Sequence, residues 1–170
     1  QGFSDINGNL LYLFKPENQI TRAELITMII KCRYGVLAPV TTTSFSDVSI
    51  THFAAPYIEK AVQLGIVKGY ADHTFRPENN ASRAEGLKMI LLTWIPLATV
   101  NDAKSNLSCT DIPAAQWFDP FFNYALNQKI VNIFSMTIKG KQVTKCLPNQ
   151  NITRAETAHS VITTKELPVQ

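Results

Sequence analysis

The sequence predicts an all-α fold assembled from repeated units, because one segment recurs three times. The copies lie at residues 14–24, 75–85 and 146–156. Each contains Arg-Ala-Glu after a Thr or Ser, and each is followed by apolar residues at helical spacing. Recurrence of this kind is typical of repeat proteins, in which one supersecondary unit is used several times.

A second block precedes the later two copies of this motif. Residues 45–48 match residues 109–112, and residues 53–67 match residues 117–131. Each full unit is therefore predicted to contain a turn, a helix, a second turn and a second helix, in this order.

The first helix of a full unit is expected from about Pro56 to Leu64, and in the later unit from about Pro120 to Gln128. Proline suits the opening turn of a helix because its missing N–H would have no partner there. Gly65 follows the first of these helices and is a typical C-terminal stop.

The second helix of each unit opens at Thr21, Ser82 or Thr153. The units span residues 1–36, 45–98 and 109–166 and together form one predicted module. In the first unit, Gly2-Phe3-Ser4-Asp5 aligns with the loop that follows the first helix of the second unit. We therefore expect the first helix of the first unit to be absent.

The composition of the chain argues against nucleic-acid binding and against a membrane span. The chain has 170 residues, of which 45% are hydrophobic, and a net charge of +3. This charge is too small for the basic surface that nucleic-acid binding normally needs. The most apolar stretch, residues 87–100, is interrupted and shorter than the roughly 20 apolar residues of a membrane span.

Catalysis and metal binding find little support in the sequence. His52, His73 and His159 lie in different kinds of element and have no metal-ligand spacing. Phosphate-loop, Gly-x-Ser-x-Gly and Cys-x-x-Cys motifs are absent from the sequence. We therefore expect no enzyme activity, no cofactor and no metal.

The repeated motif is predicted to form the N-terminus of a helix. The Thr21 hydroxyl can accept a hydrogen bond from the third backbone N–H, and Glu24 can accept one from the N–H of Thr21, which makes a capping box. The equivalent predicted caps are Ser82 with Glu85 and Thr153 with Glu156.

The motif arginines need a further explanation. Arg22, Arg83 and Arg154 place a cation in the first turn of a helix, where the helix dipole disfavours positive charge. An anion should therefore lie nearby. It is either an internal carboxylate or a ligand carboxylate or phosphate bound by the guanidinium and the free N–H groups of the helix start. The internal candidates are Asp5, Asp47, Asp72 and Asp111.

The cysteines suggest a covalent link. Phe45 and Phe75 occupy matching places around one helix and one turn, so we expect them to pack together. The third unit has Cys109 and Cys146 at these two places, which predicts a disulfide and an oxidising, extracytoplasmic location. Cys32 falls late on a helix and is expected to be a buried free thiol.

These residues together resemble the S-layer homology repeat. The likeness rests on residues 45–48, the helix from Phe53, residues 65–70, residues 75–77 and residues 82–85. It implies three repeats about a pseudo-threefold axis, with helices packed in a central bundle and binding grooves between neighbouring repeats.

The resemblance also implies a function. S-layer homology modules are non-catalytic anchors that hold exported proteins to the cell envelope or S-layer. Their usual ligand is a secondary cell-wall polysaccharide whose terminal N-acetylmannosamine carries a pyruvate ketal. The motif arginines would contact this carboxylate, with Arg83 favoured most. The predicted ligand-binding residues are Arg83, Arg22, Arg154, Lys68, Gly69, Tyr70, Asp47 and Trp117.

Two alternatives remain at this point. The chain could be a protein–protein assembly module of the cell surface, in which a neighbouring chain or segment completes the first repeat. It could also bind peptidoglycan. The third repeat departs from the family pattern, because Lys129 and Ile133 replace Gly65 and Gly69.

Overall fold

A computed structural model describes the chain at residues 3–4, 10–11, 14–103, 109–113, 115–131, 134–138 and 140–167. Asp5 and Ile133, both used in the sequence analysis, lie outside these residues. The described chain is mostly helical, so the predicted all-α class is confirmed. Its helices are α1 (Arg22–Tyr34), α2 (Ala55–Gln63), α3 (Arg83–Trp94), α4 (Leu97–Asn101), α5 (Asp119–Asn127) and α6 (Arg154–Lys165). Its strands are β1 (Phe3–Ser4), β2 (Leu10–Leu11), β3 (Phe134–Ile138) and β4 (Lys141–Lys145).

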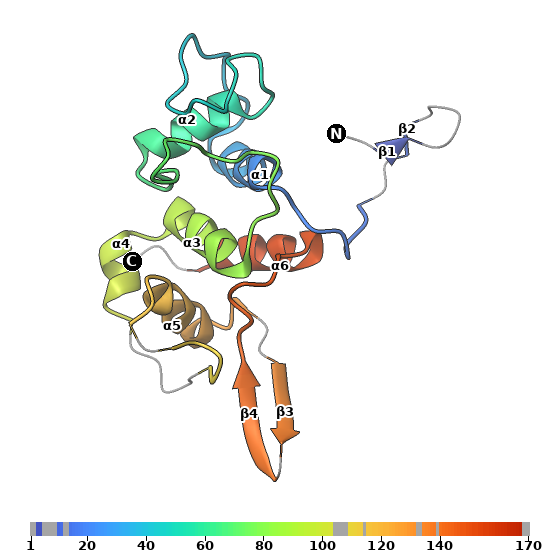
Figure 1. The fold of residues 1–170 in the computed structure, drawn as a ribbon, viewed down its shortest axis with the longest axis vertical. Helices are drawn as coiled ribbons and strands as arrows, with labels where there is room; N and C mark the ends of the chain where they lie inside the picture. Colours follow the sequence, from blue (N-terminus) through green and yellow to red (C-terminus); the bar gives the residue numbers. More distant parts are fainter. Residues whose placement is uncertain are drawn as a thin grey trace.

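The three motif helices α1, α3 and α6 form the middle of the helical body (Figure 1). Helix α3 contacts both α1 and α6, while α2 packs on α1 and α5 packs on α3. The short helix α4, which the sequence did not predict, contacts α5. Among the described residues, no helix has the length and apolar character needed to cross a membrane.

The turns in front of the motif helices are joined by backbone hydrogen bonds. The N–H of Ile20 donates to the carbonyl of Ile152 (3.2 Å), that of Ile152 to Ala81 (2.9 Å), and that of Ala81 to Ile20 (3.0 Å). These three bonds close a ring that links the first, third and second motifs. Pseudo-threefold symmetry of the whole module stays a prediction.

Two hydrophobic cores share α3. The first contains the apolar residues of α1 and α2 together with Met89 and Ile90 of α3. The second contains the apolar residues of α5 together with Leu87 and Leu91, on another face of α3. Because α3 contributes to both cores, it connects the two halves of the helical body.

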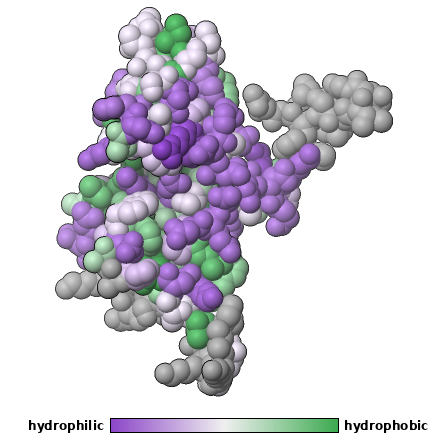
Figure 2. Space-filling model, in the orientation of Figure 1, coloured by the Kyte–Doolittle hydropathy of each residue, from purple (hydrophilic) through white to green (hydrophobic). Residues whose placement is uncertain are grey.

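Strands β3 and β4 form an antiparallel hairpin that projects away from the helices (Figure 1). Phe134 pairs with Lys145 at its base and Ile138 with Lys141 at its tip. These two strands were not predicted from the sequence. Hydrophilic residues cover much of the view in Figure 2, and most of its apolar patches lie over the half of the body that contains α5.

The cysteines are arranged in part as predicted. Cys109 and Cys146 form a disulfide in the third repeat. At the equivalent positions of the second repeat, Phe45 and Phe75 pack with their ring centroids 5.5 Å apart. Cys32 is a free thiol but is exposed, so the prediction of a buried thiol is wrong. The physical reason is that the whole last turn of α1, residues 31–34, is exposed.

Candidate functional site

Capping boxes start all three motif helices. At α1, the Thr21 hydroxyl accepts from the Glu24 backbone N–H (3.2 Å), and the Glu24 carboxylate accepts from the Thr21 N–H (3.1 Å). The same reciprocal bonds occur between Ser82 and Glu85 and between Thr153 and Glu156. The hydroxyls and glutamates of the motif therefore have a structural role.

Each motif arginine contacts the next motif in the ring. Arg22 pairs through Nη1 with Glu85 (2.8 Å), and its Nε donates to the Phe75 carbonyl (2.8 Å). In the same way, Arg83 forms an ion pair with Glu156, and its Nε donates to the Cys146 carbonyl. Arg154 forms an ion pair with Glu24 (3.9 Å), and its Nε donates to the Phe14 carbonyl. The internal anion is thus the glutamate of a neighbouring capping box.

The aspartates considered as partners have other roles. Asp47 accepts hydrogen bonds from the backbone N–H groups of Phe75 (2.8 Å) and Arg76 (2.7 Å). Asp111 does the same for Cys146 and Leu147. Asp47 therefore holds the turn before α3. It is not among the residues that line the groove described next, and its contact with a ligand stays a prediction.

An open groove lies beside Arg22, with a volume of about 250 Å³. We call it the Arg22 groove. It brings together Lys68, Gly69, Tyr70 and Trp117, four of the residues predicted to bind the ligand. The arginine among them is Arg22 of the preceding repeat, whereas the prediction had favoured Arg83. The remaining lining residues are Ile66, Val67, Glu85, Lys88 and Met89.

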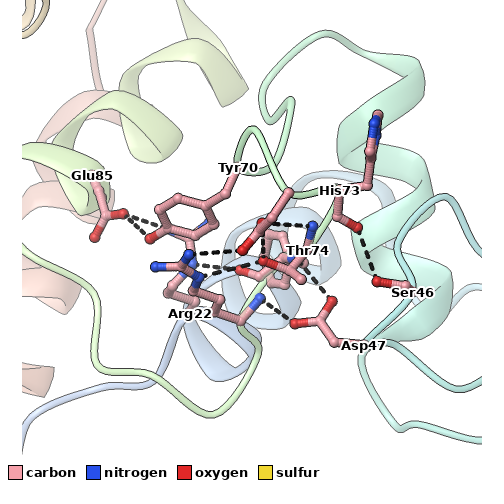
Figure 3. Close-up of polar contacts among 10 residues, drawn as sticks. Arg22, Ser46, Asp47, Tyr70, His73, Thr74 and Glu85 are labelled. Carbon is pink, nitrogen blue, oxygen red and sulfur yellow. Dashed lines mark hydrogen bonds and ion pairs between the residues drawn. The ribbon is translucent and has the colours of Figure 1, made fainter.

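Aromatic rings hold the Arg22 guanidinium in place. Its central carbon lies 4.9 Å from the ring centre of Tyr70 and 4.7 Å from that of Phe75. The Tyr70 hydroxyl donates to Glu85 (2.6 Å), the same carboxylate that pairs with Arg22 (Figure 3). Burial alone would raise the pKa of Glu85, but bonds from Tyr70 and Ser82 and the Arg22 charge together lower it. Glu85 is therefore ionised at neutral pH.

Positive charge exceeds negative charge in the Arg22 groove. Arg22, Lys68 and Lys88 face one carboxylate, that of Glu85. Burial, and then the charges of Lys68 and Arg22, lower the pKa of Lys88. An anion in the groove would relieve this repulsion, so the groove favours anionic ligands.

Trp117 gives the groove an apolar wall. Its side chain is 53% exposed, and the Lys88 ammonium lies 5.5 Å from its ring centre. An exposed ring beside cationic groups can stack on a flat apolar face of a ligand while the cations bind its charge. Lys88 was not predicted from the sequence as a binding residue. It is the next cation after Arg83 on α3, at the position that Thr27 has in α1 and His159 has in α6.

Gly69 is required by the fold beside the groove. Its φ is +72°, and a Cβ atom here would overlap the Phe45 ring and lie 2.8 Å from the Thr74 carbonyl oxygen. Only glycine fits this position without strain. The close approach is thus to the core of the protein's own repeat.

The equivalent groove beside Arg83 is nearly closed, with a volume of about 10 Å³. Phe134 takes the place of Tyr70, with its ring centre 5.5 Å from the Arg83 guanidinium, and His159 takes the place of Lys88. The predicted preference for Arg83 as the ligand contact therefore receives no support from the shape of its surroundings.

A third groove lies beside Arg154, with a volume of about 450 Å³. Phe53 stands there at the position that Trp117 has in the Arg22 groove, and Thr27 at that of Lys88. Arg154 is packed near the ring of Phe14, at 5.3 Å. This groove is larger in volume than the Arg22 groove and has a different set of cations, Arg154 and Lys31.

One protein family and several known proteins are similar to this chain in sequence. Residues 44–85 match the model of the S-layer homology domain. The chain is 33% identical over 111 residues to Cell surface glycoprotein 1 of Acetivibrio thermocellus, covering 62% of the chain and 5% of that protein. It is 36% identical over 108 residues to the Cellulosome-anchoring protein of the same organism, covering 61% of the chain and 23% of the relative.

A further relative is a Surface layer protein of Brevibacillus choshinensis, 35% identical over 81 residues, which are 46% of the chain and 7% of that protein. The chain thus corresponds to a small part of each of these relatives. The family match includes the turn of Lys68, Gly69 and Tyr70, and it ends at Glu85; all four residues line the Arg22 groove. The chain therefore contains an S-layer homology domain.

Proposed function

We propose that this chain is a non-catalytic, extracytoplasmic module that anchors a protein to the cell envelope by binding cell-wall polysaccharide in the Arg22 groove. The observation that carries the proposal is an open groove in which Arg22, Lys68 and Lys88 outnumber one carboxylate beside an exposed tryptophan. The names of two relatives, a cellulosome-anchoring protein and a surface layer protein, support the same role.

The ligand end group that fits this chemistry is an acidic sugar, and we propose a pyruvate ketal on N-acetylmannosamine. The guanidinium of Arg22 has more N–H donors than its bonds to Phe75 and Glu85 use. The carboxylate of the ketal would lie among Arg22, Lys68 and Lys88, and the sugar ring would stack on Trp117. Charge-assisted hydrogen bonds supply the affinity, and the stacking orients the ring.

The test is co-sedimentation of the purified chain with isolated wall sacculi. Lys88→Thr removes a groove cation and introduces the residue that α1 carries at the same position, Thr27, so the helix should tolerate it. We expect binding to weaken about tenfold, the effect of losing one charged contact. The matched control is Lys165→Thr, which removes an exposed lysine from the end of α6. Equal affinities of the two variants would contradict the placement of the site.

The nature of the ligand is tested on the sacculi. Binding should be lost when the secondary polysaccharide is extracted, and reduced when its ketals are hydrolysed but the polymer is retained. Binding that survives hydrolysis of the ketals would overturn the pyruvylated end group but keep the polysaccharide. Binding that survives extraction would identify peptidoglycan as the ligand, and absence of binding would favour an assembly module.

A further inference from the structure

Arg76 contacts one wall of the Arg22 groove without lining the groove itself. Its guanidinium carbon lies 4.0 Å from the ring centre of Tyr70, closer than that of Arg22, which lies 4.9 Å from the same ring. Tyr70 lines the groove, and Arg76 is not among the lining residues. An effect of Arg76 on a ligand in the groove should therefore pass through Tyr70.

The guanidinium of Arg76 is held by two polar side chains, although the side chain is 44% exposed. Its Nη2 pairs with the carboxylate of Asp72 (3.0 Å), and its Nε donates to the Thr74 hydroxyl (3.4 Å). The same hydroxyl donates to Asp72 (2.6 Å). Hydrogen bonds from Thr74 and then from Arg76 lower the pKa of Asp72 to about 2, so this carboxylate is ionised at neutral pH. The guanidinium thus has a defined place beside the ring.

The backbone of Arg76 is left-handed, with a φ of +58°, and Asp47 accepts a hydrogen bond from its N–H (2.7 Å). The equivalent residues of the other repeats have a similar backbone, since φ is +47° at Lys15 and +53° at Leu147. The conformation therefore belongs to the repeated framework. The guanidinium at this position is found in the second repeat alone.

The other contacts of Tyr70 leave one rotation of its ring free. Its hydroxyl donates to Glu85 (2.6 Å, Figure 3), and its backbone N–H donates to the Thr74 carbonyl (2.9 Å). The hydroxyl oxygen lies on the axis about which the ring turns, so this hydrogen bond does not fix the tilt of the ring. The corresponding torsion of tyrosine has a broad energy minimum. The tilt is restrained by groups that contact the ring itself, which include the guanidinium groups of Arg22 and Arg76.

We propose that Arg76 is a positioning residue of the Arg22 groove, which fixes the tilt of the Tyr70 ring and thereby raises the affinity for the ligand. The proposal rests on the proposed function, in which wall polysaccharide binds in this groove. A ring that turns would change both the shape of the groove wall and the contact with Arg22. In the third repeat the two positions hold Phe134 and Leu147, and the groove there is nearly closed.

The experiment combines co-sedimentation with wall sacculi and NMR of 13C-labelled tyrosine rings. Arg76→Leu introduces the residue of the third repeat, Leu147, which has a similar φ, so the backbone should be retained. Arg76→Lys keeps the positive charge but lacks the planar group. Both substitutions are also made in a Tyr70→Ala background. Lys165→Thr controls for the loss of an exposed cation elsewhere on the chain.

Arg76→Leu should weaken binding two- to fivefold, about the effect of losing an exposed cation–π contact, and Arg76→Lys should cause most of the same loss. In the Tyr70→Ala background, neither substitution should weaken binding further. The melting temperatures should stay within about 2 °C of the parent, because the ion pair with Asp72 is exposed. Parent-like binding by Arg76→Lys would overturn the proposal, since charge alone would then explain the effect. A loss that persists without Tyr70 would overturn it by indicating direct contact with the ligand.

The ring signals distinguish a failure of this proposal from a failure of the proposed function. The Tyr70 signal, assigned by its absence from Tyr70→Ala, should shift in both Arg76 variants without any ligand, whereas that of Tyr124 in α5 should not. An unchanged Tyr70 signal would overturn the positioning role whatever the sacculi show. A shifted signal with undiminished binding would overturn the link to affinity, while weak binding of Lys88→Thr would still support the groove as the site. Absence of binding by the parent would overturn the proposed function and, with it, any role of Arg76 in binding.

Discussion

The Arg22 groove and the groove beside Arg83 use the same framework but differ in what they can bind. Both have a capping box, a buried arginine paired with the next glutamate, and an aromatic ring over the guanidinium. One is open at about 250 Å³ and the other is nearly closed at about 10 Å³. The repeated motif therefore builds the framework, whereas the residues around it determine whether a ligand can enter.

The turns that support these two grooves are held differently. Phe45 packs on Phe75 in front of α3, while Cys109 is bonded to Cys146 in front of α6. Asp47 and Asp111 make the same pair of backbone contacts in both turns. The third repeat thus has a covalent bond where the second has a ring contact.

The largest expected effect is that of reducing the disulfide. The bond closes a segment with a sequence separation of 37, so its loss should lower the free energy of unfolding by about 3–4 kcal/mol. Hydrogen exchange should accelerate more in α5 and α6 than in α2. Denaturation with and without reductant measures the first effect, with Cys32→Ser as the thiol control. Equal acceleration in α2 would show that the two turns are not independent.

The next effect concerns Gly69 in the open groove. Gly69→Ala should cost about 2–3 kcal/mol, since the new methyl group must displace the Phe45 ring or the Thr74 carbonyl. Gly65→Ala is the matched control. Gly65 has a similar φ of +70° but no atom near its would-be Cβ, so its cost should stay near 1 kcal/mol. Thermal or chemical denaturation compares them, and equal losses would mean that backbone conformation alone requires Gly69.

The smallest expected effect concerns the aromatic rings that contact the two arginines, Tyr70 at Arg22 and Phe134 at Arg83. Tyr70→Phe introduces the residue found at Phe134 and removes the hydrogen bond to Glu85, at a cost of about 1 kcal/mol. Folding lowers the pKa of Glu85 below its ordinary value of 4.5. Its contribution is therefore present at neutral pH and is lost as the pH falls below about 4.5.

Unfolding measured from pH 6 to pH 3 should show a shallower loss of stability for Tyr70→Phe than for the parent chain. Parallel curves would indicate that the tyrosine hydroxyl does not set the ionisation of Glu85. Binding of the wall polysaccharide at neutral pH provides the second readout, because Tyr70 lines the open groove.

The features that the sequence predicts correctly are local or repeated ones. Helix starts depend on neighbours such as Thr21 and Glu24, so their pattern can be seen in a short stretch. The disulfide was predictable because the two members of one contacting pair change together. The partner of Arg22 was not predictable, since Glu85 is 63 positions away in another repeat. For the same reason, alignment of repeats did not show that Lys68, Gly69 and Tyr70 line a groove together with Arg22.

The hairpin of β3 and β4 was missed for a different reason. Apolar and polar residues alternate in residues 134–138, and Gly140 follows as a turn residue, which is a pattern typical of a strand that enters a hairpin. Because the other two repeats have no equivalent of this segment, alignment with them indicates only a longer loop. Repeat alignment is informative where copies agree and uninformative where one copy has an insertion.

The closed ring of hydrogen bonds among Ile20, Ala81 and Ile152 limits how such a module can change in size. In an open solenoid, units can be added or removed at an end, and each change alters one junction. Here each motif turn has two neighbours, so removing one repeat breaks two junctions and leaves the remaining pair unable to close. An additional copy would have to open an existing junction. Evolution can therefore vary the residues around each arginine far more freely than the number of repeats.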